Sequence, residues 1–379
     1  MKKEQREQIM PIISIVLPSY NGEKFICDAI DSIINQSIID WELIIINDGS
    51  TDATGRIANE YAIKDKRIRV IDNKTNMKLP ESLNIGFRKS IGEFLTWTSD
   101  DNIFMPHALE HMVDYLCMHP EYPMVCADMD TYDIESGERG HFAEYDPQIM
   151  YVADAVGACF LYRREVLQAI GEYDTSLFCA EDYDYWIRVL RHFGRIGHLN
   201  ETLYIYRYHS GTLTDTKLSL VRKRTSQLLW KHKDWVLSGI SEDENLTIQF
   251  YYQMLRGGNL THEVKEIVFE FIPELEGNMV SDQSCSWIVF GAGKIGSSVY
   301  DRFKDRVKFF SDSNPSLWGK KKEGIIILSL EEMADKASEY QVIVAAGTSK
   351  QPSMIRTLYK LGIKKYTTFE TLLHYYDDI

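Results

Sequence analysis

The sequence has no long hydrophobic run. No window of its 379 residues holds the roughly 18 consecutive apolar residues that a membrane-spanning helix needs. Residues 1–10 are charged, and the apolar run that follows is short and is interrupted by Pro18. We therefore expect a first strand at this point and not a signal peptide.

Positive charge is also in short supply. The sequence has 42 Lys and Arg residues against 56 Asp and Glu residues, a net charge of −14, which argues against a general nucleic-acid-binding surface and predicts no nucleic-acid partner. Cysteine is scarce and has neither metal nor disulfide spacing, which suits a reducing cytoplasm. The six cysteines are Cys27, Cys117, Cys126, Cys159, Cys179 and Cys285.

The length and the balance of residue types indicate a multi-domain globular protein. At roughly 100–200 residues per domain the chain is long enough for two domains, and its 44% hydrophobic and 26% charged residues are ordinary for such proteins.

The first hundred residues alternate between strand and helix patterns. Continuous apolar runs, rich in β-branched residues, predict strands buried on both faces, and helical spacing or polarity fills the gaps between them. The predicted strands are residues 12–17, 41–46, 68–71 and 94–97. This alternation predicts an α/β fold with a mostly parallel, doubly wound sheet and helices on both faces.

Polar residues follow three of these strands, at 18–21, 48–51 and 99–101. Ligands bind outside the carboxyl ends of strands in such sheets, so we expect these segments to converge. Asp100 and Asp101 are adjacent carboxylates that repel one another, an arrangement that suits a divalent cation but also a solvated loop or helix cap. Asp48 can likewise recognise a ligand or close an Asx-turn.

The three segments together resemble a known family. Residues 16–21 (VLPSYN), 46–50 (INDGS) and 99–101 (SDD) resemble, in order and spacing over about the first 210 residues, a family 2 glycosyltransferase of the GT-A fold. The resemblance implies a nucleotide-sugar donor, usually a UDP-sugar. It implies that Pro18 and Tyr20 pack on the uracil and that Asp48 accepts a hydrogen bond from its ring N–H.

The resemblance also assigns the groups around the diphosphate. Asp100 would bind the ribose, and Asp101 would bind Mn²⁺ or Mg²⁺ bridging the phosphates, with His209 as a metal ligand or phosphate contact. Many relatives carry a third Asp where this chain has Thr98.

Two asparagines fall where relatives place polar residues near the nucleotide. They are Asn76 and Asn84, and each can equally cap a helix. This chain departs from many relatives nearby, with Lys78 in place of Gly and Leu83 in place of Arg.

The segment EDYDYWIRV, residues 181–189, is the second predicted chemical centre. An inverting transfer needs a carboxylate to take the proton of the attacking hydroxyl, and the resemblance assigns this role to Asp182, with Glu181 as the alternative. Acidic residues that begin a helix can also simply complement its dipole. We expect Trp186 to be a core residue and not a sugar platform.

A basic amphipathic helix is predicted within residues 217–236. Such a helix can lie on an anionic membrane, which would suit a lipid-linked acceptor, or can pack on the first domain with a solvated basic face. Further helices are predicted from residue 242 to residue 275, as a connector.

The last part of the chain has a glycine motif after a strand. Gly291, Gly293 and Gly296 follow the run 286–290, and Asp312 ends the next strand about 20 residues on, the order found in dinucleotide-binding βα units. The stretch resembles small Rossmann-like domains of bacterial sugar-modifying proteins. A structural or oligomerising module is the other interpretation.

These observations predict three segments: a GT-A domain over 1–215, a helical connector over 216–283 and a Rossmann-like domain over 284–379. The expected function is metal-dependent, inverting transfer of a hexosyl group from a UDP-sugar to a hydroxyl of a glycan or lipid-linked acceptor in polysaccharide synthesis. It would take place in the cytoplasm or at the inner face of the membrane. The alternative is a non-catalytic sensor that binds a nucleotide-sugar or a dinucleotide.

Overall fold

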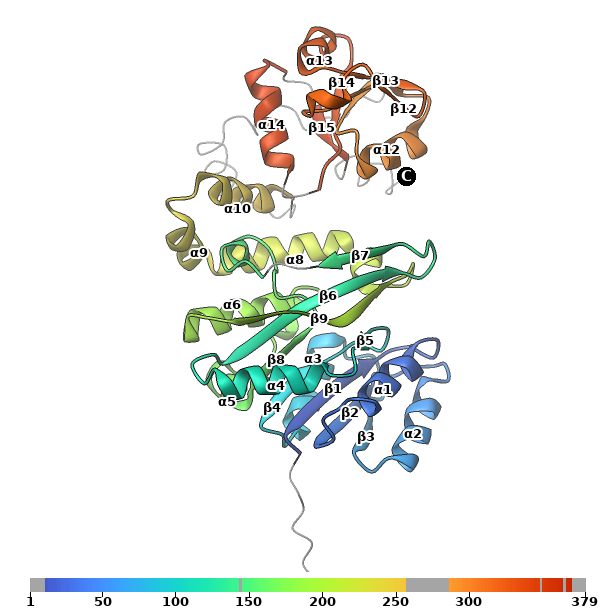
Figure 1. Cartoon of the computed structure of the whole chain (residues 1–379), viewed down its shortest axis with the longest axis vertical. Coiled ribbons are helices and arrows are strands. Elements are labelled where there is room, and N and C mark those ends of the chain that lie inside the picture. The colour runs from blue at the N-terminus through green and yellow to red at the C-terminus, as the bar shows by residue number, and fades with distance from the viewer. Residues whose placement is uncertain (1–10, 143–144, 257–285, 348–349, 364–365, 370–379) are drawn as a thin grey trace, which may run out of the picture. The chain divides into compact units, whose positions relative to one another are not determined.

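The computed structural model describes residues 11–142, 145–256, 286–347, 350–363 and 366–369 (Figure 1). The chain divides into two compact units, Met1–Leu246 and Thr247–Ile379, and each is an α/β structure with its own sheet. The predicted helices between residue 257 and residue 275 lie outside the described residues. None of the helices in the described ranges combines the length and the apolar character that a membrane crossing requires.

Four parallel strands form one half of the first unit's sheet, in the order β3-β2-β1-β4. Their bounds are Ile13–Ser19 for β1, Trp41–Asn47 for β2, Ile68–Asp72 for β3 and Phe94–Trp97 for β4. The helices between them are α1 (Ile26–Ile34), α2 (Thr54–Lys64) and α3 (Leu79–Lys89). The α/β fold and the four predicted strands are confirmed: β1, β2 and β4 are almost wholly buried, whereas β3 at the edge of the sheet is partly exposed.

The other half of the sheet is mixed. β8 (Phe160–Arg163) runs antiparallel to β4 and to β6 (Met124–Asp133), and β6 pairs in parallel with β9 (Gly197–Tyr208) as two long neighbouring strands (Figure 1). The short strands β5 (Ile103–Phe104) and β7 (Arg139–Phe142) complete it. The helices of this half are α4 (Ala108–Met118), α5 (Arg164–Ile170) and α6 (Glu181–Phe193).

The apolar segment that precedes α5 is a strand over only part of its length. Only residues 160–163 form a strand. Gly157 has a φ of 72°, a left-handed conformation that interrupts an extended chain, and the N–H of Val156 donates to Asp154 in an Asx-turn of 2.9 Å. A Cβ at Gly157 would contact the methyl group of Met129, so tight packing accounts for the small residue there.

The helices that follow β9 in the described residues of this segment are α7 (Leu213–Thr216), α8 (Leu218–Lys231), α9 (Lys233–Ile240) and α10 (Glu244–Arg256). Leu228 and Leu229 are buried. The basic residues of α8 are not all in solvent: the Lys231 ammonium lies 3.0 Å from carboxylate oxygens of both Asp174 and Asp184. The helix therefore packs on the first unit with part of its charge turned inward.

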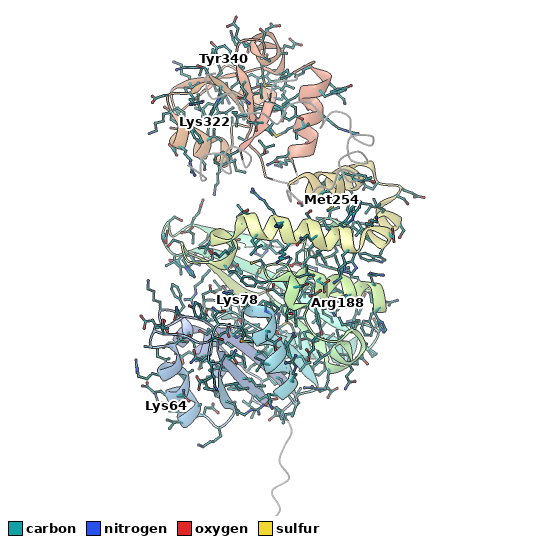
Figure 2. The ribbon with its side chains drawn as sticks, turned by 180° about the vertical axis from the view of Figure 1, so that it is seen from behind. Lys64, Lys78, Arg188, Met254, Lys322 and Tyr340 are labelled. Carbon is teal, nitrogen blue, oxygen red and sulfur yellow. The ribbon has the colours of Figure 1, made fainter. Side chains whose placement is uncertain are left out.

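Asp184 of α6 is the centre of this contact. Its fully buried carboxylate accepts hydrogen bonds from Arg188 at 2.7 Å, Lys231 at 3.0 Å and His232 at 3.2 Å. Arg188, labelled in Figure 2, also donates to the carbonyls of Ile170 and Glu172. Burial alone would raise the pKa of Asp184, but the hydrogen bond from His232 and the charges of Arg188 and Lys231 outweigh it and hold the pKa well below its ordinary value.

The second unit is built on a six-stranded sheet in the order β12-β13-β11-β10-β14-β15. All its pairs are parallel except β12 with β13. The strands are Trp287–Phe290 (β10), Val307–Ser311 (β11), Lys321–Lys322 (β12), Ile325–Leu328 (β13), Gln341–Val344 (β14) and Tyr366–Thr368 (β15). Its helices are α12 (Lys294–Phe303), α13 (Leu330–Lys336) and α14 (Gln351–Lys360).

We predict that Asp184→Asn lowers the free energy of unfolding of the first unit by about 3 kcal/mol at pH 7, because it leaves buried cationic donors without their counter-charge. Since the folded pKa of Asp184 is depressed, its contribution is fully present above the unfolded pKa of about 4 and is lost as the pH falls through the folded pKa. Urea unfolding at pH 7 and at pH 3 measures both effects.

The matched control is Glu172→Gln. The ion pair of Glu172 with Arg88 is about half exposed on both sides, so its loss should cost less than about 1 kcal/mol. Equal losses in the two variants would contradict a special role for the buried carboxylate.

Candidate functional site

The carboxyl ends of three parallel strands meet at one edge of the first sheet. Ser19 of β1 pairs with Asn47 of β2, and Val16 pairs with Trp97 of β4. The N–H of Asp48 donates to the carbonyl of Ser19 at 2.8 Å. The predicted convergence of the three polar segments is therefore confirmed, and it follows from the parallel register.

Asp100 is held against the turn that follows β1. The hydroxyl of Ser19 donates to its Oδ2, and a Cβ on Gly22 would occupy the position of that carboxylate. Burial raises the pKa of Asp100 to about 7, the Ser19 bond lowers it in part, and the charge of Asp101 raises it again. Ser19 and Gly22 had no assigned role in the sequence, where they were only part of a turn signal.

Asp101 makes one hydrogen bond and leaves one oxygen unsatisfied. Its Oδ2 lies 3.2 Å from Nε2 of His209. Its Oδ1 is buried and has no hydrogen-bond partner among the described residues. Burial raises the pKa of Asp101, while His209 and Arg207 lower it in part. An ionised carboxylate of this kind is costly in a protein interior unless a further donor or cation reaches it.

The residues around Asp101 fix its position. Arg207 donates to the carbonyl of Asp101 and, at 2.7 Å, to the carboxylate of Asp28, and its backbone N–H donates to Asn102 at 2.8 Å. Its guanidinium is buried, so this arginine holds the strand end in place. Thr98, where relatives carry a third acid, is also buried, with its hydroxyl 2.5 Å from that of Tyr204.

The chemistry of the Asp101–His209 pair fits a divalent cation. A buried carboxylate oxygen without a partner and an imidazole nitrogen lie side by side, and both are metal ligands. The N–H of Gly211 donates to Nδ1 of His209 at 3.1 Å, so Nε2 carries the proton of the neutral ring and faces Asp101. A metal on Nε2 would need the other tautomer and the release of Gly211. In the described ranges, no group of three or more protein ligands surrounds a possible metal position.

Asp48 organises the loop before α3. Its Oδ1 accepts hydrogen bonds from the side chain of Asn73 and the N–H of Met77, both at 2.8 Å, and its Oδ2 accepts from the N–H of Lys78 at 3.0 Å. Asn76 accepts from the same Lys78 N–H at 2.9 Å in an Asx-turn before α3, whose N-cap residue is Lys78 and which has no side-chain cap bond. A carboxylate has about four acceptor positions, so Asp48 keeps one, on Oδ2.

The other predicted nucleotide contacts differ in their surroundings. Tyr20 is half exposed, and Pro18 is partly buried in β1. Asn84 is buried, and its amide exchanges two hydrogen bonds of 2.9 Å with the backbone of Tyr173. A nucleotide contact by Asn84 would require these bonds to open, whereas their structural role in holding α3 is direct.

A group of carboxylates lies at the start of α6. Glu181 is buried and accepts the N–H of Cys179 at 2.6 Å, and Asp182 accepts the N–H of Tyr183 at 2.7 Å. Burial and the charge of Asp182 raise the pKa of Glu181 to about 8, and burial raises the pKa of Asp182. Trp186 is fully buried, so its predicted place in the core is confirmed.

A third acid, Asp154, belongs to the same group and was missed in the sequence. Burial and the charge of Asp182 raise its pKa to about 8. Asp154 stands in the irregular segment before β8, about 28 residues from Asp182, and no motif marks it. Tyr183 ties the two segments together by donating to the carbonyl of Met150 at 3.0 Å.

Hydrogen bonds and aromatic contacts connect these carboxylates with the strand ends. Nε1 of Trp97 in β4 donates to the hydroxyl of Tyr173 at 3.1 Å. Tyr173 stacks on Tyr185 of α6 with ring centroids 4.2 Å apart. These buried contacts connect β4 with α6, the helix that begins with Glu181 and Asp182.

The glycine motif of the second unit has the predicted strand, turn and helix. Gly291 has a φ of 112°, and a Cβ there or at Gly296 would collide with a backbone carbonyl, whereas Gly293 faces open space. Oδ2 of Asp312 accepts the N–H of Ala292 at 2.8 Å, so this acid binds the glycine turn itself. A ribose hydroxyl would have to compete for that oxygen.

Comparison with known proteins agrees with this geometry. Residues 14–171 match the model of glycosyl transferase family 2. EpsE of Bacillus subtilis (strain 168), provisionally named a glycosyltransferase, is 33% identical over 207 residues, which are 53% of this chain and 74% of EpsE.

Two solved structures share the fold. They are the mannosyltransferase PcManGT from Pyrobaculum calidifontis in complex with GDP-Man and Mn²⁺ (TM-score 0.51, 15% identity, 69% of this chain and 80% of that one) and S. aureus TarS 1-349 in complex with UDP-GlcNAc (TM-score 0.50, 18% identity, 69% and 82%). At these identities the likeness establishes the GT-A fold alone.

We predict that Asp154→Asn stabilises the first unit at pH 8 and leaves it unchanged near pH 4. The unfolded carboxyl ionises near pH 4 but the folded one only near pH 8, so folding weakens as the pH rises between these values. The variant removes that loss, and urea unfolding at pH 8 should show a gain of about 1–3 kcal/mol.

Asp114→Asn is the control, because Asp114 is exposed on α4 and should change stability by less than about 0.5 kcal/mol at either pH. A lower free energy of unfolding for Asp154→Asn than for the wild type at pH 8 would contradict the predicted cost of ionising Asp154 in the folded protein.

Proposed function

The chain belongs to glycosyl transferase family 2, and we propose that its first unit transfers a hexosyl group from a UDP-sugar to an acceptor hydroxyl, in a metal-dependent reaction that inverts the anomeric centre. The single observation that carries this proposal is the site geometry. Asp48, Asp100 and Asp101 follow β2 and β4 at one edge of the sheet, where Ser19 at the end of β1 contacts both Asp48 and Asp100.

The remaining acceptor position of Asp48 supports uracil as the base. Three of its acceptor positions are used within the loop before α3, which leaves one for a ligand. Uracil presents one ring N–H, whereas guanine presents a ring N–H and an exocyclic amine that need two acceptors. The half-exposed Tyr20 ring is available to pack on the base, together with Pro18.

Asp100, Asp101 and His209 are the proposed diphosphate end of the donor site. Asp100 would bind the ribose, and Asp101 with His209 would hold a divalent cation, which neutralises charge on the departing diphosphate. Mg²⁺ prefers oxygen ligands, so the imidazole favours Mn²⁺. Arg207 and Ser19 hold the two carboxylates in position.

Asp182 is the proposed general base. It would accept the proton of the acceptor hydroxyl while that oxygen bonds to the anomeric carbon and the bond from this carbon to the diphosphate oxygen breaks on the opposite face. A raised pKa makes Asp182 a stronger base than an ordinary carboxylate near neutral pH. Glu181 is less accessible, because it is buried and accepts the N–H of Cys179.

The acceptor is proposed to be a glycan or a lipid-linked glycan in polysaccharide synthesis. Leu213 and Leu218 are more than a third exposed, and Lys217 and Lys223 are exposed beside them. Apolar and basic side chains on one segment support peripheral contact with an anionic membrane surface at the cytoplasmic face.

We also propose that the chain has three parts, divided at residues 215 and 283, and that the last part is Rossmann-like. Dinucleotide binding at Gly291, Gly293, Gly296 and Asp312 is the second candidate function, which would suit a sensor. The open space at Gly293 favours it, while the bond between Asp312 and the glycine turn opposes it.

We predict that Asp182→Asn reduces sugar transfer by more than 100-fold, because general base catalysis contributes roughly 10²–10⁴-fold, and leaves nucleotide affinity unchanged. A screen of nucleotide-sugars for slow hydrolysis identifies the donor without a known acceptor, and transfer is then measured with candidate glycans. Glu181→Gln is the comparison variant. Full transfer by Asp182→Asn would place the base elsewhere.

A further inference from the structure

Lys78 has a backbone conformation that only glycine adopts readily. Its φ is 72° and its ψ is 160°, in a region that is strained for any residue with a Cβ. Asn21, Lys78 and Cys179 are the non-glycine residues of positive φ in the described part of the first unit. All three lie in segments of the candidate site, and asparagine alone tolerates such values well.

The loop does not need the lysine side chain for its shape. The bonds that fix this backbone come from the Lys78 N–H, which donates to Asp48 at 3.0 Å and to Asn76 at 2.9 Å. Glycine has the same N–H and would adopt the conformation without strain. The Lys78 side chain therefore destabilises the folded state through backbone strain, and the shape of the loop does not require it.

The ammonium of Lys78 is exposed and forms no ion pair with any residue in the described ranges. Its Nζ lies 5.9 Å from the centroid of the Phe178 ring. Phe178 precedes Cys179, which donates its N–H to Glu181. Figure 2 labels Lys78 where the early (blue) and later (green) parts of the first unit meet.

Lys78 thus stands between the two ends of the site. Its own N–H touches Asp48, the proposed base contact, and its side chain reaches toward the loop that leads to Asp182. In a nucleotide-sugar, the ribose and the diphosphate join the base to the sugar. The charge balance agrees, because two phosphates would enter a site that already holds the carboxyl groups of Asp48, Asp100 and Asp101.

We propose that Lys78 is a donor-recognition residue whose ammonium binds the diphosphate of the nucleotide-sugar. This inference rests on the proposed function and adds a second cation, from the loop before α3, to the metal proposed at Asp101 and His209. Any residue with a Cβ at position 78 has the same backbone strain, whereas only a cationic side chain can bind the diphosphate. Substitutions of Lys78 therefore separate the strain from the binding.

The test is isothermal titration of the full chain with UDP and with uridine, in the presence of Mn²⁺. In Lys78→Gln and Lys78→Gly the affinity for UDP should fall about tenfold, the value of a charge-assisted hydrogen bond, and the affinity for uridine should not change. Lys78→Arg should retain most of the UDP affinity. Thermal unfolding should show Lys78→Gly raising the midpoint by about 2–4 °C, with no gain for Lys78→Gln.

Lys74→Gln is the matched control, because Lys74 is an exposed lysine of the same loop and its loss removes the same charge. Equal UDP affinity in wild type and Lys78→Gln, or an equal loss in Lys74→Gln, would overturn the role of Lys78. A loss of uridine affinity in Lys78→Gln would assign the lysine to the base pocket and also overturn it. A wild-type chain that binds no UDP at all would instead overturn the proposed function, and this inference with it.

Discussion

Two neighbouring carboxylates at the end of β4 are the constraint on which the first unit depends. Asp100 and Asp101 repel each other and are both largely removed from water, so that burial raises the pKa of each. The structure compensates with one hydroxyl from the β1 turn and one imidazole from the end of β9. These contacts require β1, β4 and β9 to end at the same edge of the sheet.

Helix α6 carries carboxylates with opposite environments. Asp184 faces Arg188, Lys231 and His232, which hold its pKa below the ordinary value. Burial raises the pKa of Glu181 and of Asp182, less than one turn earlier, and the charge of Asp182 raises that of Glu181 further. The neighbouring cations therefore distinguish Asp184, which fixes α8 on the fold, from Glu181 and Asp182, whose raised pKa values favour proton uptake.

The strands that could be predicted are those whose signal is local. The β-branched runs of β1 and β2 are buried on both faces and lie where the pattern put them. β6 extends from Met124 to Asp133 because it pairs with the long strand β9, and pairing with a strand distant in the sequence produces no local pattern. The left-handed conformation of Gly157 likewise limits the length of β8, although the residues before this strand are largely apolar.

The site carboxylates that directly follow strands could be predicted from the sequence. Residues that act by holding another residue in position could not. Ser19 and Gly22 matter because they touch Asp100, and this contact spans about 80 residues of sequence. Asp154 reaches Asp182 only through the fold. Asn84 and Asp312 were recognised as polar residues at meaningful positions, but their partners are backbone groups that no pattern specifies.

The central claim is that Asp101, together with His209, anchors a metal-bound diphosphate. Its most direct test is the UDP affinity of wild type and Asp101→Asn, measured by calorimetry with and without Mn²⁺. The account predicts that Mn²⁺ tightens UDP binding at least about tenfold in wild type, a coupling of about 1.4 kcal/mol, and that the variant keeps its metal-free affinity but loses this gain. Equal UDP affinity with and without Mn²⁺ in wild type, or an undiminished gain in Asp101→Asn, would contradict it.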